Sequence, residues 1–232
     1  MLATLLTLAD SRLPAGGHAH SAGAEQAVTE GVVTDVATLA LFLRRRLATS
    51  GTVAAALSVR AAVAAAAVVG AVPADPALDR AAHLLAQLED EADARMPLAA
   101  TRAASRAQGR GLVRVGRAAW PSTVWDLLPR APHQALALGV AGALGGAPGP
   151  GVAVVAAYQS LVAPATAAQR LLGLDPVAVT ALLVSMTGAV HAVADAAAAD
   201  AAAGVDLPLD SDVLAELLTA GHTPRKDKLF AS

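Results

Sequence analysis

The chain has 232 residues and a formal net charge of −2, which allows one large domain or two small ones. So small a net charge creates no field that attracts nucleic acid or anionic lipid. The absence of cysteine excludes disulfides, thiolate zinc sites and cysteine nucleophiles, and it fits the cytoplasm. The start of the chain is apolar but lacks the basic residues and the cleavage site of a signal peptide.

Nearly every segment has the apolar spacing of a helix, and alternation of period two is almost absent. Aromatic residues are only 2% of the chain, so we expect a core of alanine, leucine and valine in helices packed backbone to backbone. A proline-rich connector near 121–132 and a Gly/Pro turn at 145–151 separate several of the helices. The predicted helices begin and end near residues 1–9, 22–30, 35–49, 75–95, 98–117, 133–144, 152–172, 176 onward and 210–219.

The Gly/Pro turn is short and lies between helices of the same composition, so it predicts an ordinary interhelical turn rather than a domain linker. The sequence therefore predicts an all-α, single-domain bundle of roughly 8–11 helices. We expect this domain to cover residues 1–221 and a C-terminal partner-binding tail to cover residues 222–232.

The mean hydropathy of +0.53 raises the question of membrane spans. The best candidates are Thr52–Val72 and Val177–Ala203, but the first contains Arg60 and the second contains His191 and Asp195. A charged side chain near the bilayer centre costs roughly 2.5–3.5 kcal/mol, and alanine contributes little to insertion. We expect no membrane span.

Several catalytic classes lack their residues in this chain. Lys226 and Lys228 are the only lysines, so no Gly-rich loop carries the lysine that a P-loop NTPase needs. Neither a G-x-S-x-G elbow nor an H-E-x-x-H motif occurs. We predict a protein that is not an enzyme and that needs no cofactor.

Two histidines, His18 and His20, flank one alanine on the glycine-rich loop at 11–20. Two imidazoles can bind nickel or zinc if a third ligand comes from elsewhere. Loop histidines that contact backbone or a partner are commoner. We therefore predict no metal site here, except transient binding of a metal ion by these two histidines. A second pair, His191 and Asp195, lies one turn apart and is predicted to be a core or interface pair rather than part of a metal site.

An arginine stripe with i, i+4 spacing occupies one face of the predicted helix at 98–117. It fits phosphates or an acidic partner surface, and it fits equally a solvated face balanced by the acidic run at 89–93. RNA binding is disfavoured because no aromatic residues interleave to stack bases. The stripe consists of Arg102, Arg106, Arg110, Arg114 and Arg117.

The tail combines cations with Leu229-Phe230 near its end, which predicts an exposed apolar contact that docks into a partner groove.

Four blocks of the sequence carry a resemblance to a known family. They are L-A-D-S-R-L-P-A-G-G-H-A-H-S-A-G-A-E at Leu8–Glu25, R-A-A-S-R-A-Q-G-R-G-L at Arg102–Leu112, the segment His133–Gly145, and L-F-A-S at residues 229–232. Together they resemble the urease accessory protein UreF family. The corresponding family motifs are D/P-S-x-L-P-x-G-G-F-x-x-S-x-G-L-E, R-x-x-S-x-x-x-G-x-x-L, H-x-x-x-x-G and a terminal L-F-x-S.

The chain departs from the family pattern at His18, where Phe is usual, at Ala24, where Leu is usual, and in the tail, which lacks the family's Tyr and Arg. Such changes resemble the actinobacterial branch. The resemblance implies an all-α homodimer that binds UreD (also called UreH) and the GTPase UreG, engages apo-urease and promotes GTP-dependent nickel insertion, with a polar route for the ion. It implies no nucleic-acid partner. The partner-binding residues that it implies are Asp10, Ser11, Pro14, Gly16, Gly17, Ser21, Glu25, Arg102, Ser105, Gly109, His222, Leu229, Phe230 and Ser232.

Overall fold

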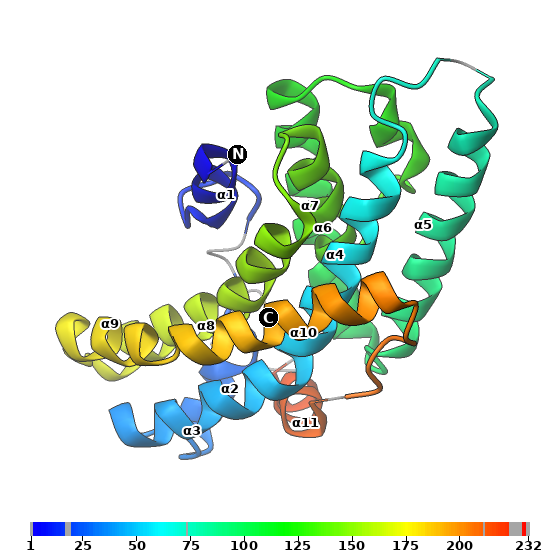
Figure 1. The fold of residues 1–232 in the computed structure, drawn as a ribbon. Coiled ribbons are helices and arrows are strands. Elements are labelled where there is room, and N and C mark those ends of the chain that lie inside the picture. The colour runs from blue at the N-terminus through cyan, green and yellow to red at the C-terminus, as the bar shows by residue number, and fades with distance from the viewer. Residues whose placement is uncertain (1, 17–19, 73, 211, 223–228, 231–232) are drawn as a thin grey trace.

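A computed structural model of the chain describes residues 2–16, 20–72, 74–210, 212–222 and 229–230. These residues are helical throughout their regular structure and contain no strand, which confirms the all-α prediction (Figure 1). The elements are α1 (Leu2–Ala9), α2 (Ala24–Thr29), α3 (Val36–Arg46), the π-helical turn η2 (Leu47–Gly51), α4 (Thr52–Ala66), α5 (Pro76–Ala94), α6 (Ala99–Ala119), the 3-10 turn η3 (Thr123–Leu127), α7 (Gln134–Leu144), α8 (Gly149–Leu172), α9 (Pro176–Ser185), α10 (Thr187–Ala203) and α11 (Val213–His222).

Aspartates begin three of the helices, as the sequence predicts. Asp35 forms a capping box with Thr38 at the start of α3, where its Oδ1 accepts from the Thr38 N–H at 2.8 Å. Asp75 and Asp175 cap α5 and α9, and each is followed by a proline at the first helical position. These caps satisfy backbone N–H groups that have no partner within the helix.

The predicted end of a helix at Thr49 is wrong. The chain instead continues from α3 through the π-helical turn η2 into α4, so that residues 36–66 form one helical run. Gly51 is helical and closely packed, because a Cβ there would lie 2.8 Å from Ser160 Oγ. Gly51 therefore allows α8 to approach the helix and does not end it.

The single long helix predicted from residue 176 is also wrong. It is divided into α9 and α10, which meet at a bend of 41°. Ser185 Oγ donates to the Leu182 carbonyl at 2.6 Å, and Thr187 Oγ1 donates to the Val184 carbonyl at 2.8 Å. Such side-chain bonds to preceding carbonyls compete with the helical ladder and favour a bend.

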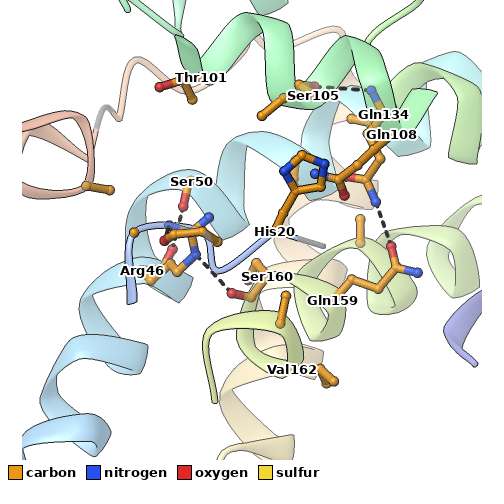
Figure 2. Close-up of a pocket in the computed structure, with 18 of the residues that line it drawn as sticks. His20, Arg46, Ser50, Thr101, Ser105, Gln108, Gln134, Gln159, Ser160 and Val162 are labelled. Atoms are coloured by element: carbon orange, nitrogen blue, oxygen red, sulfur yellow. Dashed lines mark hydrogen bonds between the residues drawn. The ribbon is translucent and has the colours of Figure 1, made fainter. Parts of the chain in front are cut away.

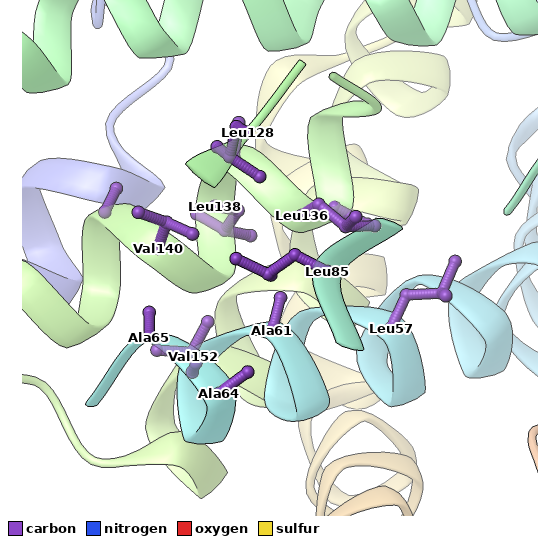
Figure 3. Packing of buried hydrophobic residues seen from close by; sticks show 14 of the residues in the cluster. Leu57, Ala61, Ala64, Ala65, Leu85, Leu128, Leu136, Leu138, Val140 and Val152 are labelled. Atoms are coloured by element: carbon purple, nitrogen blue, oxygen red, sulfur yellow. The ribbon is translucent and has the colours of Figure 1, made fainter. Parts of the chain in front are cut away.

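The buried side chains gather in two clusters, one around α4, α5, α6 and α7 and the other around α2, α3, α8, α9 and α10. Helices α4 and α8 supply residues to both clusters, so the two form one continuous fold. Figure 3 shows the first cluster, where Leu57 and Ala61 of α4 lie near Leu85 of α5 and Leu136 of α7.

Helices α4 and α7 pack closely against each other in the core. A Cβ at Gly139 of α7 would lie 2.5 Å from the Ser58 carbonyl oxygen of α4. The buried Ser58 hydroxyl donates to the Ala135 carbonyl oxygen at 2.9 Å, which satisfies a polar group inside this contact. The prediction of helices packed backbone to backbone is confirmed here.

By length and composition alone, two helical runs among the described residues are apolar enough to cross a membrane, and a third is added if the bent pair α9–α10 counts as one span. The two runs are Val36–Ala66 and Gly149–Leu172, in place of the candidate at Thr52–Val72. Within their most apolar windows, 61% and 56% of the residues are buried inside the protein. Much of this apolar surface is therefore used in contacts between helices.

Candidate functional site

The motif blocks Arg102–Leu112 and His133–Gly145 meet in one polar cluster at the start of α7. His133 is fully buried and precedes the helix, and its Nε2 lies 2.8 Å from Asp93 Oδ1 of α5. Its Nδ1 lies 3.0 Å from Ser105 Oγ of α6, and that oxygen also accepts from the Gln134 N–H at 3.2 Å. Glu89 Oε1 accepts from the His133 N–H at 2.9 Å. The structure thus brings α5, α6 and α7 together through their polar side chains.

These contacts determine which protonation states the cluster favours. Burial lowers the pKa of the His133 imidazole below its usual value. Burial also raises the pKa of Glu89, although bonds from His133 and Arg106 oppose that rise. Partial burial raises the pKa of Asp93, but hydrogen bonds from His133 and Arg106 outweigh it and hold that pKa below its usual value. A neutral His133 can donate from Nε2 to Asp93 and accept at Nδ1 from the Ser105 hydroxyl, so that both ring nitrogens have a hydrogen-bond partner.

The arginine stripe is divided in two by its surroundings. Arg106 forms ion pairs with Glu89 at 3.0 Å and with Asp93 at 2.8 Å, and it donates to the Ala131 carbonyl at 2.7 Å. Arg102 forms an ion pair with Asp93 at 3.8 Å and donates to the Met96 and Pro97 carbonyls at 2.7 and 2.8 Å. Balance by the acidic run is therefore confirmed for these two residues. Arg110, Arg114 and Arg117 are exposed.

Two glycines of α6 permit close approach of other segments. A Cβ at Gly109 would lie 2.0 Å from the Pro132 carbonyl oxygen, and a Cβ at Gly111 would lie 2.5 Å from the Ala15 carbonyl oxygen. Any side chain there would force backbone to move. Gly109 therefore allows the segment before His133 to pack against α6, and Gly111 allows the N-terminal loop to do so.

The N-terminal loop follows α1 and runs beside α6. Asp10 and Arg12 form an ion pair at 2.8 Å, and hydrogen bonds from Arg12 lower the pKa of Asp10 to about 2. Ser11 and Pro14 are exposed. Gly16 has a φ of 86°, and no atom lies within 4 Å of a Cβ built on it, so this position needs glycine for its left-handed backbone rather than for space. Gly17 and His18 lie outside the described residues.

A pocket of about 700 Å³ lies between this loop, η2, α6, α8 and α11. Figure 2 shows Gln134 and Gln159 at its wall, where Gln134 Nε2 donates to Gln159 Oε1 at 2.9 Å. Gln159 Nε2 in turn donates to the Leu8 carbonyl at 2.7 Å, which connects the polar start of α7 to the end of α1. His20 and Ser105 also line the pocket. Three motif blocks thus share one cavity.

Arg46 is a pocket residue that sequence reasoning missed. Its Nε donates to the Ser160 carbonyl and its Nη1 to the Ala22 carbonyl, both at 3.0 Å (Figure 2). Burial lowers the pKa of its guanidinium, which the charges of Asp212 and Glu216 oppose. It is the last of three consecutive arginines, and no spacing rule distinguishes it because the π-helical turn that follows has no sequence signal of its own.

Helix α11 closes one side of the pocket and is held by two carboxylates. Asp212 accepts from Arg45 Nε and from the Ala215 N–H, both at 3.1 Å. Glu216 accepts from the Leu98 N–H at 3.0 Å and from Thr101 Oγ1 at 3.1 Å, and burial raises its pKa. The C-terminal helix is thus attached to α3 and to the start of α6.

The C-terminal residues Leu229 and Phe230 contact Glu25 of α2, which is buried like Ser21. Its Oε1 accepts from the Leu229 N–H at 2.7 Å and its Oε2 from the Phe230 N–H at 3.1 Å. Leu229 is 78% exposed, as expected, whereas Phe230 packs against the second core cluster and lines the pocket. The prediction that both tail residues are exposed is therefore wrong for Phe230. His222 ends α11, and Ser232 lies outside the described residues.

The described part of the chain contains no group of three or more His, Cys, Asp or Glu side chains placed to hold a metal ion. His191 and Asp195 are exposed on α10, so a core position for this pair is wrong. Nothing in the pocket places a second imidazole beside His20 among the described residues.

Comparison with known proteins gives one consistent result. The family model described as UreF matches residues 33–187. A protein of Mycolicibacterium vanbaalenii named urease accessory protein UreF is 48% identical over 231 residues, covering 100% of this chain and 99% of that protein. Proteins with the same name from Mycobacterium sp. strain JLS and Mycobacterium tuberculosis H37Rv are 47% and 42% identical, again over 100% of this chain and 99% of theirs. These alignments include the N-terminal block and the tail, so the chain belongs to the UreF family of urease accessory proteins.

Proposed function

We propose that this protein is a non-catalytic scaffold that acts with UreD (UreH) and the GTPase UreG to insert nickel into apo-urease. Membership of the UreF family supports a role in urease maturation. The chain has no lysine outside its last seven residues, which assigns the nucleotide chemistry to UreG. The small net charge and the lack of cysteine fit a cytoplasmic protein, and the family resemblance implies that it works as a homodimer.

One observation carries this proposal: the motif blocks, which are far apart in the sequence, converge around a single pocket. The N-terminal loop, Ser105 of α6, Gln134 of α7 and Phe230 of the tail all line it. Its polar wall combines side-chain amides, hydroxyls, carboxylates and the His20 imidazole with four arginines. The oxygen and imidazole groups suit a divalent ion in transit, and the four carboxylates balance the charge of the arginines. We propose that nickel is cargo of the assembled complex and that this chain offers surfaces and a polar route.

The proposed partner surface includes the tail at residues 222–232 and the N-terminal loop. We expect that deletion of Lys228–Ser232 abolishes co-purification with UreD, because it removes the exposed apolar Leu229. The fold should persist, because Phe230 only packs against the edge of the second core cluster and none of the buried core residues is removed. Pull-down with affinity-tagged UreD measures this, with circular dichroism as the control for folding. Unchanged co-purification would remove the tail from the partner surface.

A further inference from the structure

The buried carboxylate of Glu25 binds the backbone N–H groups of Leu229 and Phe230, the two tail residues that the structure describes. We propose that Glu25 is a positioning residue that holds Leu229 and Phe230 in one pose, so that Leu229 faces outward to contact the partner. The inference rests on the proposed scaffold function for the identity of that partner. The contacts described for Leu229 and Phe230 are all within this chain.

The geometry at Glu25 is that of a carboxylate shared by two consecutive backbone donors. Each oxygen accepts one N–H, at 2.7 Å from Leu229 and 3.1 Å from Phe230. The Glu25 residue is only 3% exposed, so water competes poorly for these bonds. Hydrogen bonds to an ionised carboxylate are about twice as strong as those between neutral groups. Two such bonds fix the position and the direction of the backbone at Leu229 and Phe230.

The side chains of the two tail residues then take different roles. Phe230 packs against the second core cluster and lines the pocket, which adds an apolar contact beside the carboxylate. Leu229 keeps 78% of its surface exposed although its N–H is held. An apolar side chain presented from a fixed backbone loses less conformational entropy on binding than one on a free terminus. Glu25 therefore acts on the partner through the tail.

Glu25→Gln provides a sharp test, because an amide has one acceptor oxygen and turns donors toward the second N–H. We expect the amides of Leu229 and Phe230 to exchange with deuterium at least about tenfold faster in the full-length variant than in the wild type. Glu30→Gln is the matched control, since Glu30 lies just after the same helix and is exposed, and the one bond described for its carboxylate comes from Gln26 Nε2. It should leave both rates unchanged.

Affinity for purified UreD gives the second readout. We expect Glu25→Gln and Leu229→Ala each to weaken binding about tenfold, and the double variant to lose less than about twofold more than Leu229→Ala alone. This lack of additivity distinguishes positioning of the tail from a separate structural role. Should Glu25→Gln fail to fold, Leu229→Pro removes one donor from the tail without altering the body of the protein, and the Phe230 amide should then exchange faster.

Equal exchange rates in the wild type and Glu25→Gln, or fully additive losses of affinity, would overturn the role of Glu25. A different result separates this inference from the proposed function. The wild type could fail to bind UreD while Glu25→Gln still speeds the exchange of the Leu229 and Phe230 amides. In that case the proposed scaffold function fails, and the positioning role of Glu25 stands.

Discussion

Gly109→Ala is expected to lower the free energy of unfolding by about 3 kcal/mol, at the upper end of what overpacking costs. Alanine normally stabilises the interior of a helix relative to glycine by up to about 1 kcal/mol. Here the added Cβ would lie 2.0 Å from the Pro132 carbonyl oxygen, so either α6 or the backbone before α7 must move. That movement would also separate His133 from Ser105. Chemical denaturation followed by circular dichroism measures the change.

The matched control for this substitution is Gly188→Ala in α10. No atom lies within 4 Å of a Cβ built at Gly188, and the residue is exposed and helical. We expect this variant to gain about 0.5 kcal/mol from its better helix propensity. Opposite signs for the two substitutions are the expected result. A stabilising effect at Gly109 would contradict the close approach of α6 to the Pro132 backbone.

Arg106→Ala is the second change with a large expected effect, a loss of about 2–3 kcal/mol of unfolding free energy. The substitution leaves the buried Glu89 carboxylate without its ion partner and removes one donor from Asp93. Breaking a buried ion pair by removing one partner costs about 3–5 kcal/mol, and the partial exposure of Arg106 reduces that cost. Urea denaturation at neutral pH measures the difference.

The loss at Arg106 should also depend on pH in a defined direction. Without the guanidinium, the pKa of Glu89, which burial already raises, moves higher still. Protonation then relieves the uncompensated charge, so the difference between variant and wild type shrinks as the pH falls toward that pKa. Arg110→Ala, one turn along the same stripe and exposed, is the control and should change stability by less than about 0.5 kcal/mol. Equal losses of unfolding free energy at Arg106 and Arg110 would contradict the different surroundings of these two arginines.

Helix identity could be predicted well from this sequence because the caps and breakers are strong. Asp75-Pro76 and Asp175-Pro176 begin helices where predicted, since an aspartate cap and a first-turn proline leave few alternatives. The errors occur where tertiary contacts oppose a local signal. Gly51 sits in a continuous helical run because α8 packs against it, and the bend at Met186 depends on hydroxyl bonds that no periodicity reveals.

The sequence predicted some residues of the candidate site but not its geometry. The motif blocks identified Ser105, Gly109 and Glu25, yet none of them indicated that Ser105 contacts His133 or that Glu25 binds the tail. Such contacts join residues far apart in the chain, and a single sequence carries no record of them. Arg46 was missed for the same reason, because its partners Ser160 and Ala22 are far from it in the chain. The π-helical turn that follows Arg46 also has no sequence signal.

The most direct test of the scaffold role is urease activation with purified components. Apo-urease, UreD, UreG, nickel and GTP are combined with and without this chain, and urea hydrolysis is followed in each mixture. We expect full activity only when the chain is present, and no hydrolysis of urea or GTP by the chain alone. Equal activation in its absence, or turnover of either substrate by the isolated chain, would contradict the account.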